Sequence, residues 1–139
     1  MPRYAADRTL LAPVDDVWAF LAEPYNLPDW WPGVSGVEPD RRGLAPGARW
    51  RVVGPNQPTY FRRPQMNGTL LVLDVVPLKR FSFQIVYDRV EADLTLQALD
   101  ERRTKASLVV DAGWLAVKRT FPHEALTRLH DLLQTGAEA

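Results

Sequence analysis

Hydrophobic and polar positions alternate with a period of two through the second half of the chain, which is the pattern of strands whose two sides face different surroundings. Turn residues, among them Pro77 and Asp88, separate the runs. In the last three runs every second residue is apolar. The pattern predicts an antiparallel sheet with one wholly apolar face, built from strands over residues 69–76, 81–87, 91–99 and 104–111.

The first half of the chain combines a helical pattern with shorter strands. Apolar residues at positions 14, 17, 18 and 21 share one helix face, so a helix is expected from about Pro13 to the break at Pro24. Residues 25–32 leave room for one more short turn of helix. The Pro-rich stretch 54–68 predicts a long loop of a kind that often forms a lid. The strands expected in this half cover residues 4–10, 34–38 and 48–53.

The last amphipathic segment predicts a helix from about residue 121 to residue 134. Thr120 can cap this helix, and Pro122 fits its first turn, where an N–H group is not needed. Residues from Thr135 onward are expected to fray. The apolar stripe, which must pack on the apolar face of the sheet, consists of Phe121, Ala125, Leu129, Leu132 and Leu133.

The order of these elements indicates the fold class. One strand, two short helices, about six consecutive antiparallel strands and a final helix make an α+β layout with the helices on one side of one sheet. With 139 residues, of which 46% are hydrophobic, the chain is expected to form a single domain over residues 1–139. We expect a curved sheet of about six to seven strands wrapped around the C-terminal helix.

Charge and composition exclude several partners. Seventeen basic and seventeen acidic residues leave no summed field that would draw the chain to nucleic acid or to an anionic membrane. The arginine pairs at 41–42, 62–63 and 102–103 resemble phosphate-binding clusters, but we interpret them as solvated turn residues. Without a membrane span or a signal peptide, the chain is expected to be cytoplasmic, with no stable membrane insertion. The absence of cysteine excludes disulfides and thiolate chemistry.

Three stretches of the sequence resemble the START-related superfamily, also called SRPBCC, which includes polyketide cyclases and lipid-transfer proteins. Its opening helix is similar to residues 12–21, APVDDVWAFL, and its tryptophan signature is similar to residues 26–32, NLPDWWP. Its strand, proline turn and strand are similar to residues 74–83, DVVPLKRFSF. The resemblance covers essentially the whole chain. It implies the helix-grip fold of the birch-pollen-allergen type, in which a cavity lies between the sheet and the C-terminal helix.

The resemblance implies a cavity without naming its ligand. Members of the superfamily carry sterols, phospholipids, quinones, hormones or polyketides, and some catalyse cyclisation or dehydration inside the cavity. The expected occupant is therefore a small hydrophobic or amphipathic molecule, such as a lipid, a quinone or a polyketide-like compound. Pro122 and the short run that follows it predict a final helix shorter or more broken than is usual in the superfamily, which leaves the cavity size open.

The sequence lacks the motifs of several enzyme classes. His123 and His130 are seven residues apart, whereas the two histidines of a zinc-protease helix are four apart, so no metal site is expected. The glycines form neither a nucleophile elbow nor a nucleotide-binding loop, so no cofactor is expected. His123 begins the last helix near the expected cavity mouth, where it is either an ordinary surface residue or a general acid or base.

Aromatic residues are the main candidates for the cavity wall. Their rings suit a planar or polycyclic ligand, and Tyr and Trp keep one polar group that can orient it. At strand spacing, the same residues are as often ordinary core. Strand parity also places Arg49 and Arg51 opposite Trp50, and we expect both arginines to face solvent. The candidate ligand-cavity residues are Trp30, Trp31, Trp50, Tyr60, Phe61, Phe83, Tyr87, Trp114 and His123.

Three hypotheses for function follow from the sequence. The leading one is noncatalytic binding or carriage of a small hydrophobic or amphipathic ligand. The second is an aromatase- or cyclase-type enzyme for a polyketide-like substrate, in which one Tyr, Arg or His transfers a proton; its catalytic residues stay unassigned because no acid–base pair is evident. The third is a protein-interaction module, in which a groove or the Trp30–Trp31 pair receives a partner chain or a second copy, as in a homodimer.

Replacing Tyr87 by Ala tests the expected cavity. Tyr87 ends the apolar strand face that contains Phe81, Phe83 and Ile85, near the expected rim, so Tyr87→Ala should weaken ligand uptake more than it lowers stability. Native mass spectrometry of bound small molecules, together with thermal unfolding, measures both effects. Unchanged affinity beside a large loss of stability would contradict the expectation.

Overall fold

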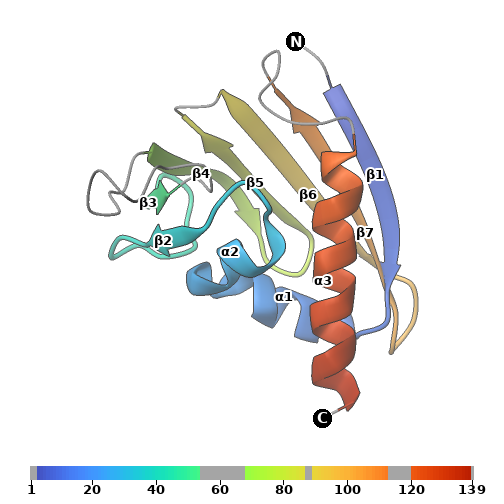
Figure 1. Ribbon diagram of the computed structural model, residues 1–139. Helices are drawn as coiled ribbons and strands as arrows, with labels where there is room; N and C mark the ends of the chain where they lie inside the picture. The colour runs from blue at the N-terminus through green and yellow to red at the C-terminus, as the bar shows by residue number, and fades with distance from the viewer. Residues whose placement is uncertain (1–2, 54–67, 87–88, 113–119, 139) are drawn as a thin grey trace.

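The computed structural model describes residues 3–53, 68–86, 89–112 and 120–138. Within them, seven antiparallel strands form one curved sheet, and a long helix lies across one face (Figure 1). This arrangement confirms the expected α+β helix-grip architecture. The elements in chain order are β1 (Arg3–Leu10), α1 (Val14–Ala22), the 3-10 turn η1 (Pro24–Asn26), α2 (Leu27–Trp30), β2 (Gly36–Glu38), β3 (Arg49–Val53), β4 (Gly68–Val76), β5 (Arg80–Ile85), β6 (Val90–Ala98), β7 (Thr104–Asp111) and α3 (Phe121–Glu138).

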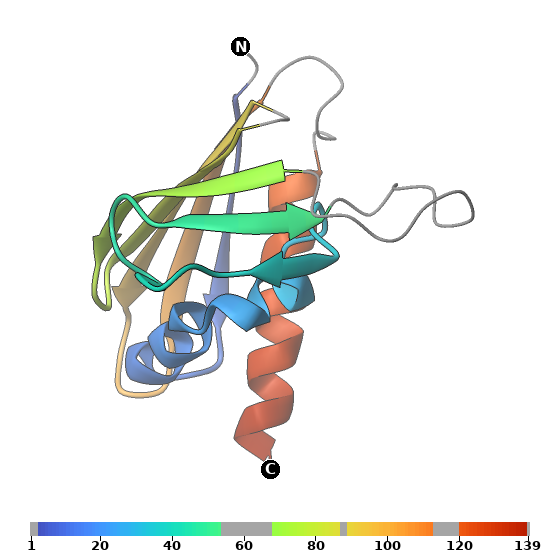
Figure 2. The same ribbon diagram turned by 90° about the vertical axis from the view of Figure 1, so that its left-hand side faces the viewer.

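The strand order across the sheet is β1-β7-β6-β5-β4-β3-β2, so only β1 departs from sequential pairing. β1 pairs with β7 along its whole length, from Arg3 opposite Asp111 to Leu10 opposite Thr104. β2 lies at the opposite edge of the sheet, and α1, η1 and α2 connect the two edges (Figures 1 and 2). These helices therefore cover one end of the inner face, the face against which α3 lies.

The inner face of the sheet is apolar, as the alternation predicts. One position differs from the expectation, because Ala98 is exposed at the end of β6. In β4, a register shift between Val72 and Asp74 places Asp74 opposite Ser82 and Val75 opposite Phe81. The buried residues of β5, β6 and β7 on this face include Phe81, Phe83, Ile85, Ala92, Leu94, Leu96, Ala106, Leu108 and Val110.

The C-terminal helix packs on β1 and β7 through one apolar stripe. The stripe differs from the prediction at three positions, because Leu132 is 38% exposed whereas Pro122 and Leu126 are buried. Leu132 lies at the flank of the stripe, and the next residue, Leu133, is buried instead. The buried residues of α3 are Phe121, Pro122, Ala125, Leu126, Leu129 and Leu133.

α3 is one continuous helix of 18 residues. The expected break and the expected end near residue 134 were therefore wrong, because the helix continues to Glu138. Pro122 does not interrupt the helix, because a first-turn residue needs no acceptor for its N–H. Thr120 precedes the helix, and its carbonyl accepts a 3.0 Å hydrogen bond from the Glu124 N–H, while its hydroxyl donates to the Glu124 carboxylate over 3.3 Å.

Charged side chains lie on the outer face of the sheet. Arg80 donates two hydrogen bonds to the Asp93 carboxylate, over 2.8 and 3.0 Å, and the Ser82 hydroxyl donates a third over 2.7 Å. Burial by itself would raise the pKa of Asp93, but these hydrogen bonds and the charge of Arg80 lower it. Arg3 forms an ion pair with Asp111 at 2.8 Å. The expected solvent exposure is confirmed for Arg49 and Arg51, and Thr95 and Gln97 of β6 are exposed as well.

Leu78, in the turn between β4 and β5, offers a test of backbone strain. Its φ of 67° lies in the left-handed region that disfavours residues with a side chain, and the residue is 39% exposed. Glycine adopts this conformation without strain, so Leu78→Gly should raise the free energy of unfolding by about 0.5–1 kcal/mol. Equilibrium unfolding in urea measures the change. Leu99, which is 42% exposed without a positive φ, is the matched control, and Leu99→Gly should lower stability; a similar loss at both sites would contradict the explanation.

Candidate functional site

Aromatic rings from several elements meet between the sheet, α2 and the start of α3. Trp31 is at their centre, with its ring centroid 5.0 Å from Phe83, 4.7 Å from Phe121 and 5.6 Å from Trp30. All three contacts are edge-to-face, a favoured geometry for aromatic pairs. The aromatic cluster, as we call it, consists of Trp30, Trp31, Trp50, Phe81, Phe83 and Phe121.

Phe81 extends the aromatic cluster along β5 toward β3. Its ring centroid lies 5.0 Å from that of Phe83 and 6.1 Å from that of Trp50. Five of the six side chains are at most 1% exposed, and Phe121 is 8% exposed. The cluster is therefore part of the core, and it lies at the place where the helix-grip fold brings the sheet and α3 together.

A change of backbone conformation directs two adjacent tryptophans into the interior. Trp30 is the last residue of α2, whereas Trp31 is extended, with φ −98° and ψ 107°. The Trp31 N–H still bonds to the Leu27 carbonyl over 2.8 Å, which ends the helix at this point. Adjacent residues in one regular helix point about 100° apart, so a helix alone would not bury both rings this fully. Pro28, in the first turn of α2, starts this short helix and thereby sets where it ends.

The indole N–H groups of the cluster differ in their partners. Trp50 Nε1 donates a 2.8 Å hydrogen bond to the Gly43 carbonyl. Within the described residues, neither Trp30 Nε1 nor Trp31 Nε1 has a hydrogen-bond acceptor, although both side chains are 1% exposed. A buried donor without an acceptor costs about 1–3 kcal/mol. These two donors are thus available to an acceptor that the described residues do not supply.

Gly33 lies directly over the polar edge of Trp31. A Cβ atom added at Gly33 would be 3.2 Å from Trp31 Nε1, 3.5 Å from Trp31 Cδ1 and 3.7 Å from Phe121 Cζ. An acceptor atom at the position of this Cβ would be about as far from Nε1 as the oxygen in an N–H···O hydrogen bond. The Trp31 N–H therefore lies at the junction of the 31–35 segment with the start of α3, beneath a residue that has no side chain.

The structure brings together four of the nine candidate residues: Trp30, Trp31, Trp50 and Phe83. His123 is on the first turn of α3 and is exposed. Two members of the aromatic cluster, Phe81 and Phe121, were placed on apolar stripes but were not selected as candidates. Strand parity with Phe83 and the position of Phe121 at the start of the helix were the available signals. The remaining candidates, Tyr60, Phe61, Tyr87 and Trp114, lie outside the described residues.

Ionisable groups with shifted pKa values lie away from the aromatic cluster. In the turn after β2, backbone N–H groups, chiefly that of Arg49, lower the pKa of Asp40. In the turn after β6, the Arg102 N–H and the Arg103 side chain lower the pKa of Asp100. The described segments contain no group of three or more His, Cys, Asp or Glu side chains placed to hold a metal ion. Over the same segments, no helix is both long and apolar enough to cross a membrane.

Two concave features have walls made wholly of described residues: one of about 630 Å³ at the turn of residues 100–103, and a groove on the outer face of the sheet. The groove is the one that lies on the sheet. Its volume is about 380 Å³, and it is lined by both ion pairs, Arg80–Asp93 and Arg3–Asp111, together with Glu91. Charged walls of this kind do not suit an apolar ligand. The inner side, with the aromatic cluster, is the better candidate for the functional site.

A family model described as polyketide cyclase/dehydrase and lipid transport matches residues 1–134 of the chain. The match includes β1, the two tryptophans of the aromatic cluster that follow α1, the whole sheet and most of α3. No curated protein sequence matches the chain. The assignment of the chain to a family therefore rests on the match to this family model.

Solved structures with the same fold cover nearly the whole chain. XoxI from Bacillus cereus has a TM-score of 0.71 and 10% identity, over 96% of each chain. NE0264 from Nitrosomonas europaea has a TM-score of 0.67 and 21% identity, over 99% of this chain and 97% of its own. The di-domain ARO/CYC BexL, from the BE-7585A biosynthetic pathway, has a TM-score of 0.68 and 18% identity. The alignment covers 96% of this chain and 47% of BexL, so this chain spans about half of that protein.

Replacing the two differently bonded indoles by phenyl rings tests whether the Trp31 N–H has a partner within the protein. Trp31→Phe and Trp50→Phe remove the same atoms from buried sites, but only Trp50→Phe also deprives the Gly43 carbonyl of its donor. We expect Trp50→Phe to cost about 1 kcal/mol more stability than Trp31→Phe. Chemical unfolding of protein stripped of small molecules measures the difference. An equal or larger loss for Trp31→Phe would show that its N–H is already bonded within the protein.

Proposed function

We propose, since the chain belongs to the polyketide cyclase/dehydrase and lipid-transport family of the SRPBCC superfamily, that it binds a small apolar ligand beside the aromatic cluster. The observation that carries this proposal is the pair of buried indole donors, Trp30 Nε1 and Trp31 Nε1, without acceptors among the described residues. A fold that only needed a packed core would gain stability from side chains without a polar atom at these positions. An acceptor atom on a ligand would offset the cost of the buried, unbonded donor.

The chemistry of the cluster defines the ligand class. Trp31 presents its ring edge to Phe83 and Phe121, so a flat molecule would find aromatic walls from three elements. The walls are apolar, which favours a ligand with few polar groups. The unbonded Trp31 N–H favours a carbonyl, ether or hydroxyl oxygen on one edge of the ligand. A quinone, a polyketide-like compound or a lipid with an oxygenated ring fits this description.

Binding or carriage without chemistry is the role that the described residues favour. Proton transfer in the interior would require an ionisable side chain next to the ligand. Among the described residues, the core that contains the aromatic cluster is built from aromatic and aliphatic side chains, and the buried polar residues are Ser82 and Thr104, neither of which is ionisable near neutral pH. The indole N–H can orient a ligand, but it cannot act as a general acid or base near neutral pH.

Cyclisation of a polyketide-like substrate is the second candidate function. It is favoured by the family description and by the fold similarity to the ARO/CYC protein BexL. An apolar, rigid wall could fold a reactive chain and hold its reacting carbons together, which accelerates cyclisation through proximity alone. The proton would then be transferred by His123, on the first turn of α3, or by a tyrosine outside the described residues.

Native mass spectrometry of the protein purified from its own host tests the proposal. A co-purifying small molecule with an oxygen-bearing, largely apolar structure is the expected result. Chemical identification of that molecule also separates the two roles: an unmodified lipid or quinone supports carriage, and a mixture of linear and cyclised forms supports catalysis. Protein that stays free of small molecules, and that also fails to bind a panel of quinones, polyketide mimics and lipids, would overturn the proposal.

Replacing Gly33 by Val tests where the ligand oxygen lies. The new side chain would start 3.2 Å from Trp31 Nε1 and fill the space from which an acceptor approaches. Loss of one hydrogen bond corresponds to an affinity about tenfold weaker. Gly36→Val is the matched control, because a Cβ there meets only Val53, at 3.8 Å. Titration with a bound compound from the previous experiment measures both variants, and equal affinities would place the ligand elsewhere.

A further inference from the structure

Positive and negative charges are segregated along the first half of the chain, although the whole chain is neutral. Residues 9–40 contain six acidic residues and neither Lys nor Arg. Residues 41–73 contain six arginines and no acidic residue. The equal totals therefore conceal two oppositely charged segments that follow each other directly in the sequence.

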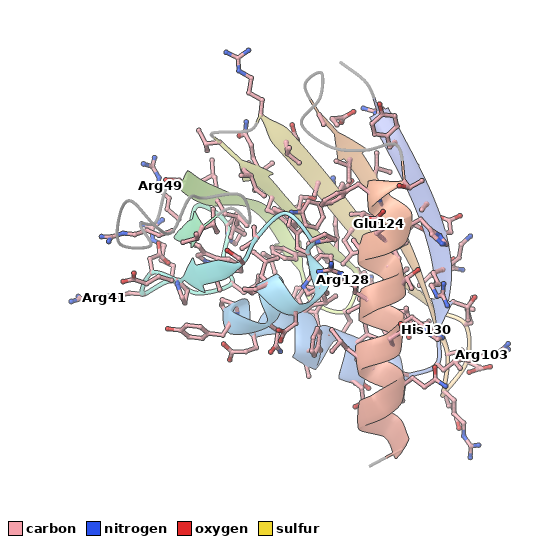
Figure 3. The ribbon with its side chains drawn as sticks, in the orientation of Figure 1. Arg41, Arg49, Arg103, Glu124, Arg128 and His130 are labelled. Atoms are coloured by element: carbon pink, nitrogen blue, oxygen red, sulfur yellow. The ribbon has the colours of Figure 1, made fainter. Side chains whose placement is uncertain are left out.

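The arginines gather on the hairpin formed by β2 and β3. The four described arginines of this segment are exposed, and Figure 3 shows Arg41 and Arg49 extending away from the body of the protein. None of the four forms an ion pair within the described residues, whereas Arg3, Arg80 and Arg103 each do. We call Arg41, Arg42, Arg49 and Arg51 the arginine hairpin.

Asp40 is the acidic residue nearest to these arginines along the chain, and its carboxylate bonds to the backbone. Its two oxygens accept hydrogen bonds from the N–H groups of Arg42 and Arg49, each over 2.9 Å. Within the described residues, no ion pair joins a guanidinium group of the hairpin to Asp40 or to Glu38, although the charge of Arg42 lowers the pKa of Asp40 and Glu38 lies opposite Arg51 across β2 and β3. Unpaired, exposed guanidinium groups are well suited to bind carboxylates, because their donors match the two carboxylate oxygens.

The acidic residues gather on the helices that follow β1. Asp15 and Asp16 are in the first turn of α1, Glu23 begins η1, and Asp29 is on α2. All four are exposed, and none forms an ion pair within the described residues. Tyr25, on η1, is 63% exposed, more than any other large apolar side chain described. We call the surface of α1, η1 and α2 that carries these residues the acidic helices.

The two surfaces adjoin. η1 and α2 pack against β2, the strand that leads into the arginine hairpin. Figures 1 and 2 both place the β2–β3 hairpin beside α1 and α2, on the side of the molecule away from the C-terminal half of α3. One face of the protein therefore carries a positive half and a negative half next to each other, with Tyr25 on the negative half.

The divided charge favours one kind of partner. A uniformly anionic partner, such as nucleic acid or an anionic membrane, would meet the acidic helices together with the arginine hairpin, so that repulsion would oppose attraction. A second copy of the chain carries both halves. A two-fold axis between the halves places each arginine hairpin opposite the acidic helices of the other copy, and such an interface closes at two subunits.

We propose that this face joins two copies of the protein into a salt-sensitive, two-fold symmetric dimer. The arginine hairpin of each copy pairs with the acidic helices of the other, and Tyr25 packs near the centre of the interface. Exposed ion pairs are individually weak and are screened by salt. The dissociation constant should therefore rise at least about tenfold between about 0.1 M and about 1 M salt, over which the screening length falls from roughly 10 Å to 3 Å.

Analytical ultracentrifugation over a range of protein and salt concentrations tests the proposal. Reversal of one half, in Arg41→Glu/Arg49→Glu or in Asp16→Arg/Asp29→Arg, should abolish the dimer, and mixing the two variants should restore it as a heterodimer. Tyr25→Ser, which changes no charge, should weaken the dimer. Arg102→Glu is the matched control, because this exposed arginine lies in the turn that carries Arg103, across the molecule from Arg41 (Figure 3). Thermal unfolding confirms that each variant is folded.

Several outcomes would overturn the proposal. Wild-type protein that stays monomeric at low salt excludes the dimer. A dimer that survives both reversals, or that Arg102→Glu weakens as strongly, lies on another face. Binding of wild-type monomer to duplex DNA or to vesicles that contain phosphatidylserine, lost in Arg41→Glu/Arg49→Glu, would show that the arginine hairpin serves an anionic partner.

Discussion

The contacts of Trp31 with its ring neighbours join parts of the chain that are far apart in sequence. Trp31 follows α2, Phe83 is in β5 and Phe121 begins α3, so one side chain fixes the opening helices, the sheet and the closing helix relative to one another. The extended conformation of Trp31 directly after a helical Trp30 makes this contact available. The placement of α2 against α3, and with it the position of Gly33 over the indole, depends on this one packing arrangement.

The aromatic cluster serves the core and the candidate site with the same residues. Trp50 shows how the fold satisfies an indole whose role is structural, since its N–H reaches the Gly43 carbonyl. Trp31 is equally buried, but its Nε1 lies beside Gly33, where an added Cβ would be 3.2 Å away. An unsatisfied donor that persists in an otherwise well-packed core is a local cost against folding. Costs of this kind are typical of residues that take part in ligand binding.

Much of the fold could be predicted from the sequence, because hydrophobic periodicity reports which side of an element is buried. The alternation in β5 to β7 predicted most of the residues that lie on the inner face of the sheet, and the apolar stripe of α1 predicted the buried side of that helix. The errors arose where burial depends on the packing partner: Ala98 lies on β6 beyond the last residue that pairs with β5, and Leu132 lies at the flank of a stripe in which its neighbour Leu133 is buried. A register shift such as the one at Val72 and Asp74 leaves no periodic signal.

The candidate site was only partly predictable, for a related reason. The tryptophan pair stands out in the sequence, so Trp30 and Trp31 were selected. Phe81 and Phe121 were not, because strand parity and the start of the helix mark them as apolar but do not show that their rings meet Trp50 of β3 and Trp31 after α2. For the charged surface, the pattern was visible in the sequence but its meaning was not. The segregation of acidic and basic residues is visible in the sequence, but a neutral total conceals it until the structure shows that both segments share one face.

The proposed ligand site and the proposed dimer interface share the segment from α1 to α2. Its inner side supplies Leu27, Trp30 and Trp31 to the core, while its outer side carries the acidic residues and Tyr25. A ligand that bonds to Trp31 would stabilise one position of this segment from inside, and a second copy docked on the acidic helices would stabilise it from outside. Two binding events that act on one segment are thermodynamically linked, and the linkage is reciprocal. If both events favour the same position of α2, ligand binding tightens the dimer by the same factor by which dimerisation tightens ligand binding.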